Sequence, residues 1–284
     1  MKALNPLNQI GLKEKTINKT AGADKRELYQ LRITKKFFLT VCFAILFGSL
    51  SLFAQQMPMK MDSAITHTTT MPTTTKMDEE LPHPFFTHMG MPEAVGTYSL
   101  RTAALLTKQT DGATKGDFAF HFETGLSRIV GLHIRNDRFL MNPSTEIMFQ
   151  FAVLRSKNGM NGISTLIEFE VPTNKGVRRI NTLVGFSSAL SSSRVSFNQV
   201  LHYNPRVDML DGSVAVVFKV TQKIFLVAEM LGTRMSDGTT MLNPVAGVKL
   251  RLNKYVVLGL GYMKPVTNTK EFSSQTIFQP EFGW

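Results

Sequence analysis

Two histidines and two methionines lie within nine residues of one another, in the stretch LPHPFFTHMGMPEAVG at positions 81–96. Imidazole nitrogen and thioether sulfur are ligands that suit a soft ion such as Cu(I). These candidate copper ligands are His83, His88, Met89 and Met91. The competing interpretation is favoured, because the pattern lacks fixed short spacing: the prolines shape a lead-in to the first strand, and Phe85 and Phe86 pack as a plug or rim.

His121 and Glu123 are two residues apart, which places them on the same face of an extended strand. An imidazole and a carboxylate at that spacing could act as an acid–base pair. Catalysis would also need a nucleophile, and the sequence has neither a His-x-Ser pattern nor a Gly-x-Ser-x-Gly elbow. We therefore predict that the protein is not an enzyme and that this pair belongs to a structural polar network.

Further polar residues alternate with apolar ones in other segments, and they are candidates to line a lumen: Glu146, Gln150, Lys249 and Arg251, together with His121 and Glu123. The basic members could bias a lumen towards anionic solutes, or they could be rim charges that meet lipid headgroups. Gly259-Leu260-Gly261 superficially resembles a dinucleotide-binding loop. It lacks the third glycine and a following helix, so close strand packing is the preferred interpretation.

The elements that would position these residues are strands. From Tyr98 onward the chain consists of segments of about ten residues with period-two alternation, which is typical of a membrane-spanning barrel. Phe118, Phe120 and Phe122 share one face, which suits lipid, while the opposite face is polar. We predict an all-β fold, an antiparallel transmembrane β-barrel. A secreted antiparallel sandwich is the alternative, and aromatic residues near strand ends count against it: Phe139, Tyr203, Tyr255, Tyr262 and Phe272.

Turn signals separate the alternating segments: Asp111-Gly112, Asn158-Gly159, Asp211-Gly212, Asp237-Gly238 and Asn253-Lys254. The predicted strands cover 98–107, 116–126, 128–139, 145–155, 162–171, 178–189, 195–203, 213–221, 223–232, 244–252, 254–263 and 274–284. Twelve strands are expected, with ten as the fallback, because an even number places both termini in the periplasm.

The final segment carries the sharpest signal. Trp284 ends the sequence, and Phe282, Pro280 and Phe278 precede it at alternate positions on one face. Such an ending resembles the recognition strand of the barrel-assembly machinery, with Phe278, Phe282 and Trp284 as the signal residues. Pro280 departs from that pattern, and it fits only where its ladder hydrogen bond is dispensable.

The N-terminal region resembles an export leader. Lys35 and Lys36 precede eighteen uncharged residues, 37–54, which we interpret as a signal peptide spanning 35–54; an uncleaved inner-membrane helix is the alternative. Residues 1–34 form a basic extension ahead of the signal peptide, and the true start of translation could lie downstream of Met1. The Met-, Thr- and Pro-rich segment 55–97 is predicted to be a disordered linker or a plug, ahead of a barrel at 98–284.

Composition excludes several classes of function. The formal net charge is +11, but residues 1–56 alone hold nine basic and three acidic side chains, and the remainder has no dense basic stripe, so nucleic-acid binding is not expected. The single cysteine, Cys42, lies within the apolar leader. The mature chain therefore offers no disulfide and no thiolate site.

The leader, the segment HPFFTHMGMPEAVGTYSLR and the terminal strand together resemble uncharacterised outer-membrane barrels of Bacteroidota, similar to the transporter-like family named after the meta-cleavage pathway of phenol degradation. That resemblance implies the outer membrane, its lipid and the assembly machinery as surroundings. Our leading functional hypothesis is a passive or facilitated transporter for a small solute. A copper-handling protein that uses the Met/His segment and a structural or adhesin-like barrel are the alternatives.

Overall fold

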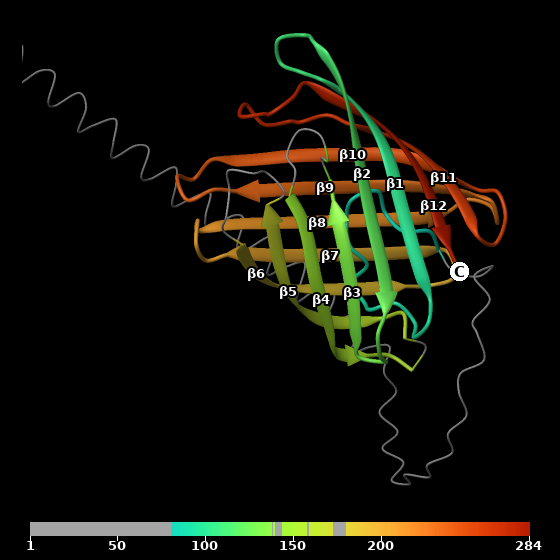
Figure 1. Ribbon diagram of the computed structural model, residues 1–284. Coiled ribbons are helices and arrows are strands. Elements are labelled where there is room, and N and C mark those ends of the chain that lie inside the picture. The colour runs from blue at the N-terminus through green and yellow to red at the C-terminus, as the bar shows by residue number, and fades with distance from the viewer. Residues whose placement is uncertain (1–80, 138, 140–143, 158, 173–179) are drawn as a thin grey trace, which may run out of the picture. The chain divides into compact units, whose positions relative to one another are not determined.

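Alternation of inward and outward side chains persists through every strand, and the strands close into a ring. The computed structural model describes residues 81–137, 139, 144–157, 159–172 and 180–284. Within them, twelve antiparallel strands form one closed barrel in which each strand pairs with its neighbour in sequence and β1 pairs with β12 (Figure 1). No helix in this part of the chain is long and apolar enough to cross a membrane. The predicted twelve-stranded all-β barrel is confirmed, and the sandwich is excluded.

The strands are β1 (Tyr98–Lys108), β2 (Thr114–Gly125), β3 (Val130–Asn136), β4 (Ser144–Arg155), β5 (Gly162–Pro172), β6 (Asn181–Ser191), β7 (Val195–Asn204), β8 (Met209–Lys219), β9 (Ile224–Arg234), β10 (Thr240–Arg251), β11 (Val256–Met263) and β12 (Ser274–Gly283). Most of the predicted bounds agree with these within three residues. β8 and β10 each begin four residues earlier than predicted, at Met209 and Thr240.

One predicted turn is wrong. Asp211 and Gly212 lie inside β8, where they pair with His202 and Leu201 of β7. The chain instead turns just before β8, where Asp208 adopts a positive φ of 49°. An Asp-Gly pair favours a turn only when no stronger pairing is available, and here the strand register overrides that local preference. Gly112 and Gly238 do occupy turns with positive φ, as their sequence context predicts.

The seam that closes the barrel joins its first and last strands. The backbone N–H of Tyr98 donates to the carbonyl of Trp284 at 2.9 Å, and the N–H of Trp284 donates back at 3.0 Å. Between Arg101–Glu281 and Ala104–Phe278 the β1–β12 pairing is interrupted, and Pro280 falls in that interval. Pro280 still pairs with Leu258 on β11. The ladder with β1 is thus interrupted where Pro280 lacks an amide donor, and it resumes in the same register at Ala104.

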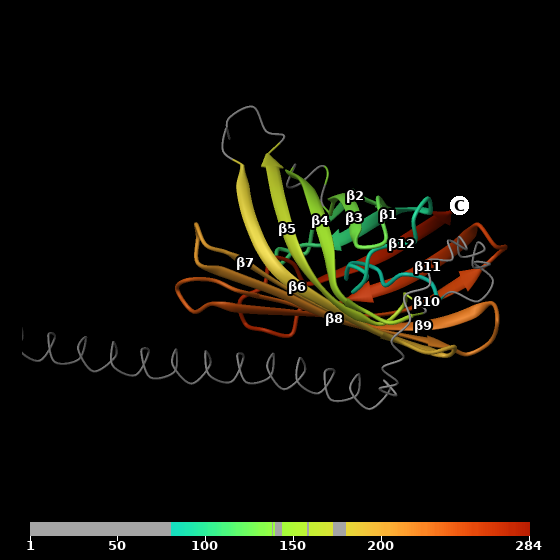
Figure 2. The same ribbon diagram turned by 90° about the horizontal axis from the view of Figure 1, so that it is seen from below.

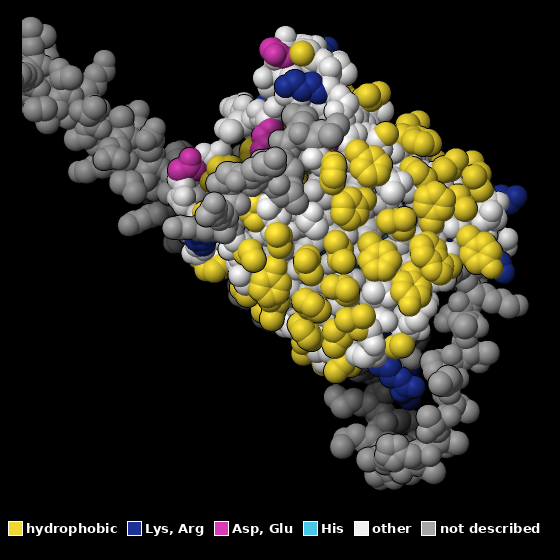
Figure 3. Space-filling view, viewed as in Figure 1, with side chains coloured by type: hydrophobic (Ala, Val, Ile, Leu, Met, Phe, Trp, Pro, Cys, Tyr) yellow, Lys and Arg dark blue, Asp and Glu magenta, His cyan; other side chains and the backbone are white. Residues whose placement is uncertain are grey.

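Two chemically distinct faces result from this alternation. On β2, Phe118, Phe120 and Phe122 alternate with the buried residues Ala119, His121 and Glu123. Figure 3 shows hydrophobic side chains spread over the visible barrel wall, with charged side chains near its margins. The outward aromatics near strand ends include Phe139, Tyr203, Tyr255 and Tyr262, which are all exposed. Phe272 was wrongly expected among them, since it is 3% exposed and packs in the interior apolar cluster.

The interior also contains the segment that leads into β1. In both ribbon views the trace of residues 81–97 runs within the ring of strands (Figures 1 and 2). Leu81, Phe85 and Phe86 join the largest interior apolar cluster, which otherwise comes from the barrel wall. We call residues 81–97 the plug. The predicted extension, signal peptide and first part of the linker fall within residues 1–80, which lie outside the described residues.

Candidate functional site

A single carboxylate holds the middle of the plug. Glu229, on β9, accepts hydrogen bonds from the backbone N–H of Phe85, Phe86 and Thr87, the last two at 3.1 and 3.0 Å. The hydroxyl of Thr87 also donates to it at 3.1 Å. Glu229 is 5% exposed, so burial of its charge is offset by these donors.

Wall side chains satisfy the plug carbonyls in the same way. Arg101 and Lys249 donate to the carbonyl of Pro84 at 2.9 and 3.3 Å. Gln279 donates to the carbonyl of Phe85 at 2.8 Å, and Gln150 donates to that of Met89 at 3.0 Å. These hydrogen bonds join wall side chains to plug backbone. The plug is thus docked in the lumen without being a strand of the sheet.

Close packing complements these hydrogen bonds. A Cβ added to Gly247, Gly259 or Gly261 would lie 2.6, 2.8 or 3.0 Å from the ring of Phe85. These three glycines on β10 and β11 therefore form a flat recess for that ring. The Gly-x-Gly motif at 259–261 serves ring packing here, in line with the interpretation as close packing.

Gly90 is the tightest point of the plug. Its N–H donates to Asn198 Oδ1 at 3.0 Å, and its carbonyl accepts from Ser187 at 3.2 Å. A side chain at this position would overlap the backbone of Ser188 on β6. Only glycine allows the plug backbone to approach the wall this closely.

Charged side chains surround the first turn of the plug. Glu281 contacts His83 Nδ1 at 2.6 Å and accepts a hydrogen bond from Lys249 at 2.8 Å. On its other side, His83 Nε2 lies 2.8 Å from Glu93 Oε1 and 3.2 Å from Glu123 Oε2. Burial lowers the pKa of His83, but the carboxylates of Glu281 and Glu123 outweigh burial and hold that pKa well above its ordinary value. His83 is therefore a cation that joins three carboxylates.

Every histidine among the described residues lies in this interior: His83, His88, His121, His133 and His202. His88, from the plug, has its ring centroid 4.7 Å from that of His121, 5.3 Å from His133 and 6.0 Å from His202. Burial and the nearby Arg135 lower the pKa of His88 well below its ordinary value, so its imidazole is neutral. The wall thus surrounds one neutral plug imidazole with three more imidazoles.

The structure distributes the predicted copper ligands over different surroundings. His83 lies among carboxylates, whereas His88 lies among imidazoles. The sulfur of Met91 is 3.7 Å from the hydroxyl of Ser164, and Met89 lines a pocket. The thioether copper site stays a prediction, and its four residues are not gathered into one cluster of contacts.

The six predicted lumen residues share the inner face of the barrel. His121, Glu123, Gln150 and Lys249 are each at most 5% exposed. Glu146 pairs with Arg135, and Arg251 lies over the ring of Phe225, 4.9 Å from its centroid. The terminal aromatics Phe278, Phe282 and Trp284 project outward, with exposures of 49%, 36% and 54%.

Sequence reasoning missed several residues that hold the plug, notably Glu229, Glu281 and Gln279, and it missed His133, which supports Gln150. Glu229 had a usable signal. It shares the inner face of β9 with Phe225 and Val227, so it is a lone carboxylate in an apolar row. Such a residue needs a partner, and that partner could have been sought in the plug.

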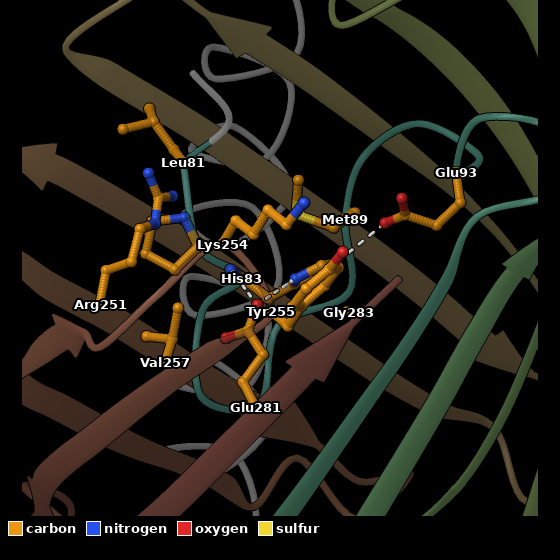
Figure 4. Close-up of a pocket in the computed structure, with 11 residues that line it drawn as sticks. Leu81, His83, Met89, Glu93, Arg251, Lys254, Tyr255, Val257, Glu281 and Gly283 are labelled. Atoms are coloured by element: carbon orange, nitrogen blue, oxygen red, sulfur yellow. Dashed lines mark hydrogen bonds and ion pairs between the residues drawn. The ribbon is translucent and has the colours of Figure 1, made fainter. Parts of the chain in front are cut away.

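A pocket lies where the plug begins, and Figure 4 shows His83 between Glu281 and Glu93 within it. Its lining also includes Arg251, Lys254 and Tyr255, which come from the end of β10 and the turn into β11. Gly283, next to the C-terminal residue, lines it as well. The pocket is therefore at the barrel end that holds the C-terminus.

Comparisons with known proteins establish the fold. No protein-family model matches the sequence, and no curated protein matches it either. Among solved structures, the KdgM porin in complex with disordered oligogalacturonate is similar, with a TM-score of 0.51, 7% identity, and coverage of 65% of this chain and 98% of that chain. An outer-membrane channel from Pseudomonas putida F1 has a TM-score of 0.48 and 8% identity, covering 69% of this chain and 98% of that one. The likeness to the KdgM porin shows a porin-like barrel fold.

Proposed function

We propose that this protein is an outer-membrane β-barrel that acts as a passive or facilitated transporter for a small polar solute, and that the plug closes it. One observation carries the proposal: the plug is bound within a polar lumen mainly by wall side chains. A segment held in this way can leave without breaking the barrel ladder. The lumen behind it is lined by polar and charged side chains, which suits a hydrated path.

The outer surface supports a membrane location. Large apolar side chains face outward on many strands, among them Leu106, Phe118, Phe186, Leu226 and Leu260. Bacterial outer-membrane barrels have an even number of antiparallel strands, and their first and last strands pair to close the ring. This barrel has both features, with strands of about 7–12 residues. By that rule, the end that holds Tyr98 and Trp284 faces the periplasm. The plug would then enter and return on the periplasmic side.

The finer family assignment is part of this proposal. The resemblance to Bacteroidota barrels and to the phenol-pathway transporter-like family rests on residues 83–101. Export by the segment 35–54 and insertion by the assembly machinery through the terminal aromatics belong to the proposal as well. The oligogalacturonate of the KdgM complex is a property of that porin, and it is not transferred to this chain.

Single-channel recording tests the transporter. The full chain and a variant lacking residues 83–92 would be refolded and inserted into planar bilayers. The intact chain is expected to show a low conductance with rare openings, and the deletion is expected to show a steady, larger conductance with liposome swelling. Heat-modifiable gel migration would establish that both barrels are folded. Folded barrels with no conductance in either protein would contradict the transporter and favour a structural barrel.

A further inference from the structure

The lumen contains a second kind of site, distinct from the docking of the plug backbone. His88, His121, Glu123 and His133 each offer one ligand atom, and these atoms all lie within 4.8 Å of one another. All four side chains are at most 5% exposed. They come from three parts of the chain, since His88 is on the plug, His121 and Glu123 are on β2, and His133 is on β3.

One ring nitrogen of this cluster lies near a carboxylate without a hydrogen bond to it. Gln150 donates its amide N–H groups to Met89 and Ser187, so its oxygen is free to accept from His133 Nε2 at 3.0 Å. His133 Nδ1, the other ring nitrogen, lies 3.4 Å from Glu123 Oε1 and has no hydrogen-bond partner among the described residues. A neutral His133 with its proton on Nε2 would direct the lone pair of Nδ1 towards Glu123, and a cation bound by both groups would satisfy them.

His88 is the second unsatisfied group. Neither of its ring nitrogens has a hydrogen-bond partner, although its side chain is almost fully buried. His133 Nδ1 and Glu123 Oε2 likewise lack a hydrogen bond, and His83 Nε2 is the cationic neighbour of that oxygen at 3.2 Å. The cluster thus points three electron-pair donors into one buried space.

We infer that His88, His133 and Glu123, with His121 as the fourth ligand, bind a divalent first-row transition-metal ion such as Zn²⁺ in the lumen. Imidazole nitrogen and carboxylate oxygen are the donors that such ions take in tetrahedral sites. The amide of Gln150, which fixes the tautomer of His133, is the kind of outer partner that metal-ligating histidines have. Neighbouring donors of a tetrahedral zinc site lie about 3.3 Å apart, so the cluster must contract slightly on binding.

Arg101 determines how the fourth ligand joins. It donates to His121 Nδ1 at 2.5 Å and to Glu123, so the Nε2 of His121 carries a proton and donates to Glu123 Oε1 at 3.0 Å. Ligation by Nε2 would move that proton to Nδ1 and displace Arg101 from the ring. Arg101 keeps its bonds to Glu123 and to the carbonyl of Pro84. His121 is accordingly the ligand whose loss should matter least.

The metal would join the plug to the wall, because His88 is the ligand from the plug. A second group with suitable ligand atoms is formed by His83, Glu93 and Glu123. His83 and Glu93 line the pocket at the C-terminal end, and Glu123 is shared with the proposed site. The proposed ligands share only His88 with the thioether copper hypothesis, and the inference holds whether or not the barrel conducts.

Metal binding by the full-length refolded protein tests the inference. The chelator-treated protein would be titrated with Zn²⁺ by calorimetry, and with Co²⁺ by visible absorption, where a tetrahedral site gives an intense d–d band. One tight equivalent is expected. His88→Gln and His133→Gln should each weaken binding more than about 100-fold, and Gln150→Leu should weaken it about 10–100-fold. Gel migration of unboiled samples would establish that each variant is folded.

His202→Gln is the matched control, because it places the same substitution at a buried histidine of the same interior that is not one of the four proposed ligands. It should keep the Co²⁺ band and the Zn²⁺ stoichiometry. Absence of a tight equivalent in the folded parent protein would overturn the inference, and so would unchanged binding by folded His88→Gln. Loss of binding in His83→Gln with retention in His88→Gln would place the ion at His83, Glu93 and Glu123, and it would also overturn the site proposed here.

Discussion

Glu229 and Thr87 are joined twice: the carboxylate on β9 accepts from the backbone N–H of Thr87 at 3.0 Å and from its hydroxyl at 3.1 Å. The pair links the centre of the wall to the centre of the plug. Because Phe85 and Phe86 donate to the same carboxylate, one wall residue organises a whole turn of plug backbone.

Glu229→Gln should therefore loosen the plug. The amide replaces one acceptor by a donor that faces plug N–H groups, and hydrogen bonds to a charged group contribute about 1.5–3 kcal/mol. We expect the open probability in single-channel recordings to rise about tenfold or more. Glu271→Gln, an exposed residue just before β12, is the control and should behave like the parent protein. Equal open probabilities for all three proteins would show that this carboxylate does not hold the plug closed.

Gly90→Ala should displace the plug by a different mechanism. Its Cβ would overlap the backbone of Ser188, and neither backbone can yield without breaking other bonds. Overpacking of this kind costs about 1–3 kcal/mol. Protease sensitivity of the plug in intact, folded barrels should increase, and the conductance should rise. Gly116→Ala, where a Cβ has no neighbour within 4 Å, should leave both measurements unchanged.

Phe85→Ala should reduce the stability of the plugged barrel. The ring is 2% exposed and fills the recess of Gly247, Gly259 and Gly261. Loss of a buried phenylalanine side chain costs about 3–5 kcal/mol. The temperature at which the unboiled form converts to the unfolded gel position should fall. Phe118→Ala, on the outer face of β2, should have the smaller effect, and a larger effect there would argue against Phe85 as the anchor of the plug.

Trp284→Ser should impair insertion more than folded stability. Trp284 projects outward with an exposure of 54%, and its backbone closes the seam with Tyr98 whatever its side chain. We expect less protein in the outer-membrane fraction, while the protein refolded in detergent migrates as the parent does. Tyr255→Ser removes another exposed aromatic and should be inserted normally. Normal insertion of Trp284→Ser would contradict an assembly role for this side chain.

The sequence by itself determined the strands and their two faces, because strand alternation is local. Phe118, Phe120 and Phe122 fix which face of β2 meets an apolar environment, and the same logic places His121 and Glu123 opposite them. The sequence also showed that the Met/His segment carries possible metal ligands, and that it could serve as a plug. These properties depend only on residues close to one another in the chain.

Only the tertiary structure decided how the two parts meet. His88 lies 45 residues before His133, and Glu229 lies more than 140 residues after the plug turn that it holds. Which side chains converge depends on ring closure and on the path of the plug through the lumen, and neither is encoded in local spacing. The predicted ligands His83 and His88 are close in sequence but have different neighbours, because the plug turns between them and presents one to carboxylates and the other to imidazoles.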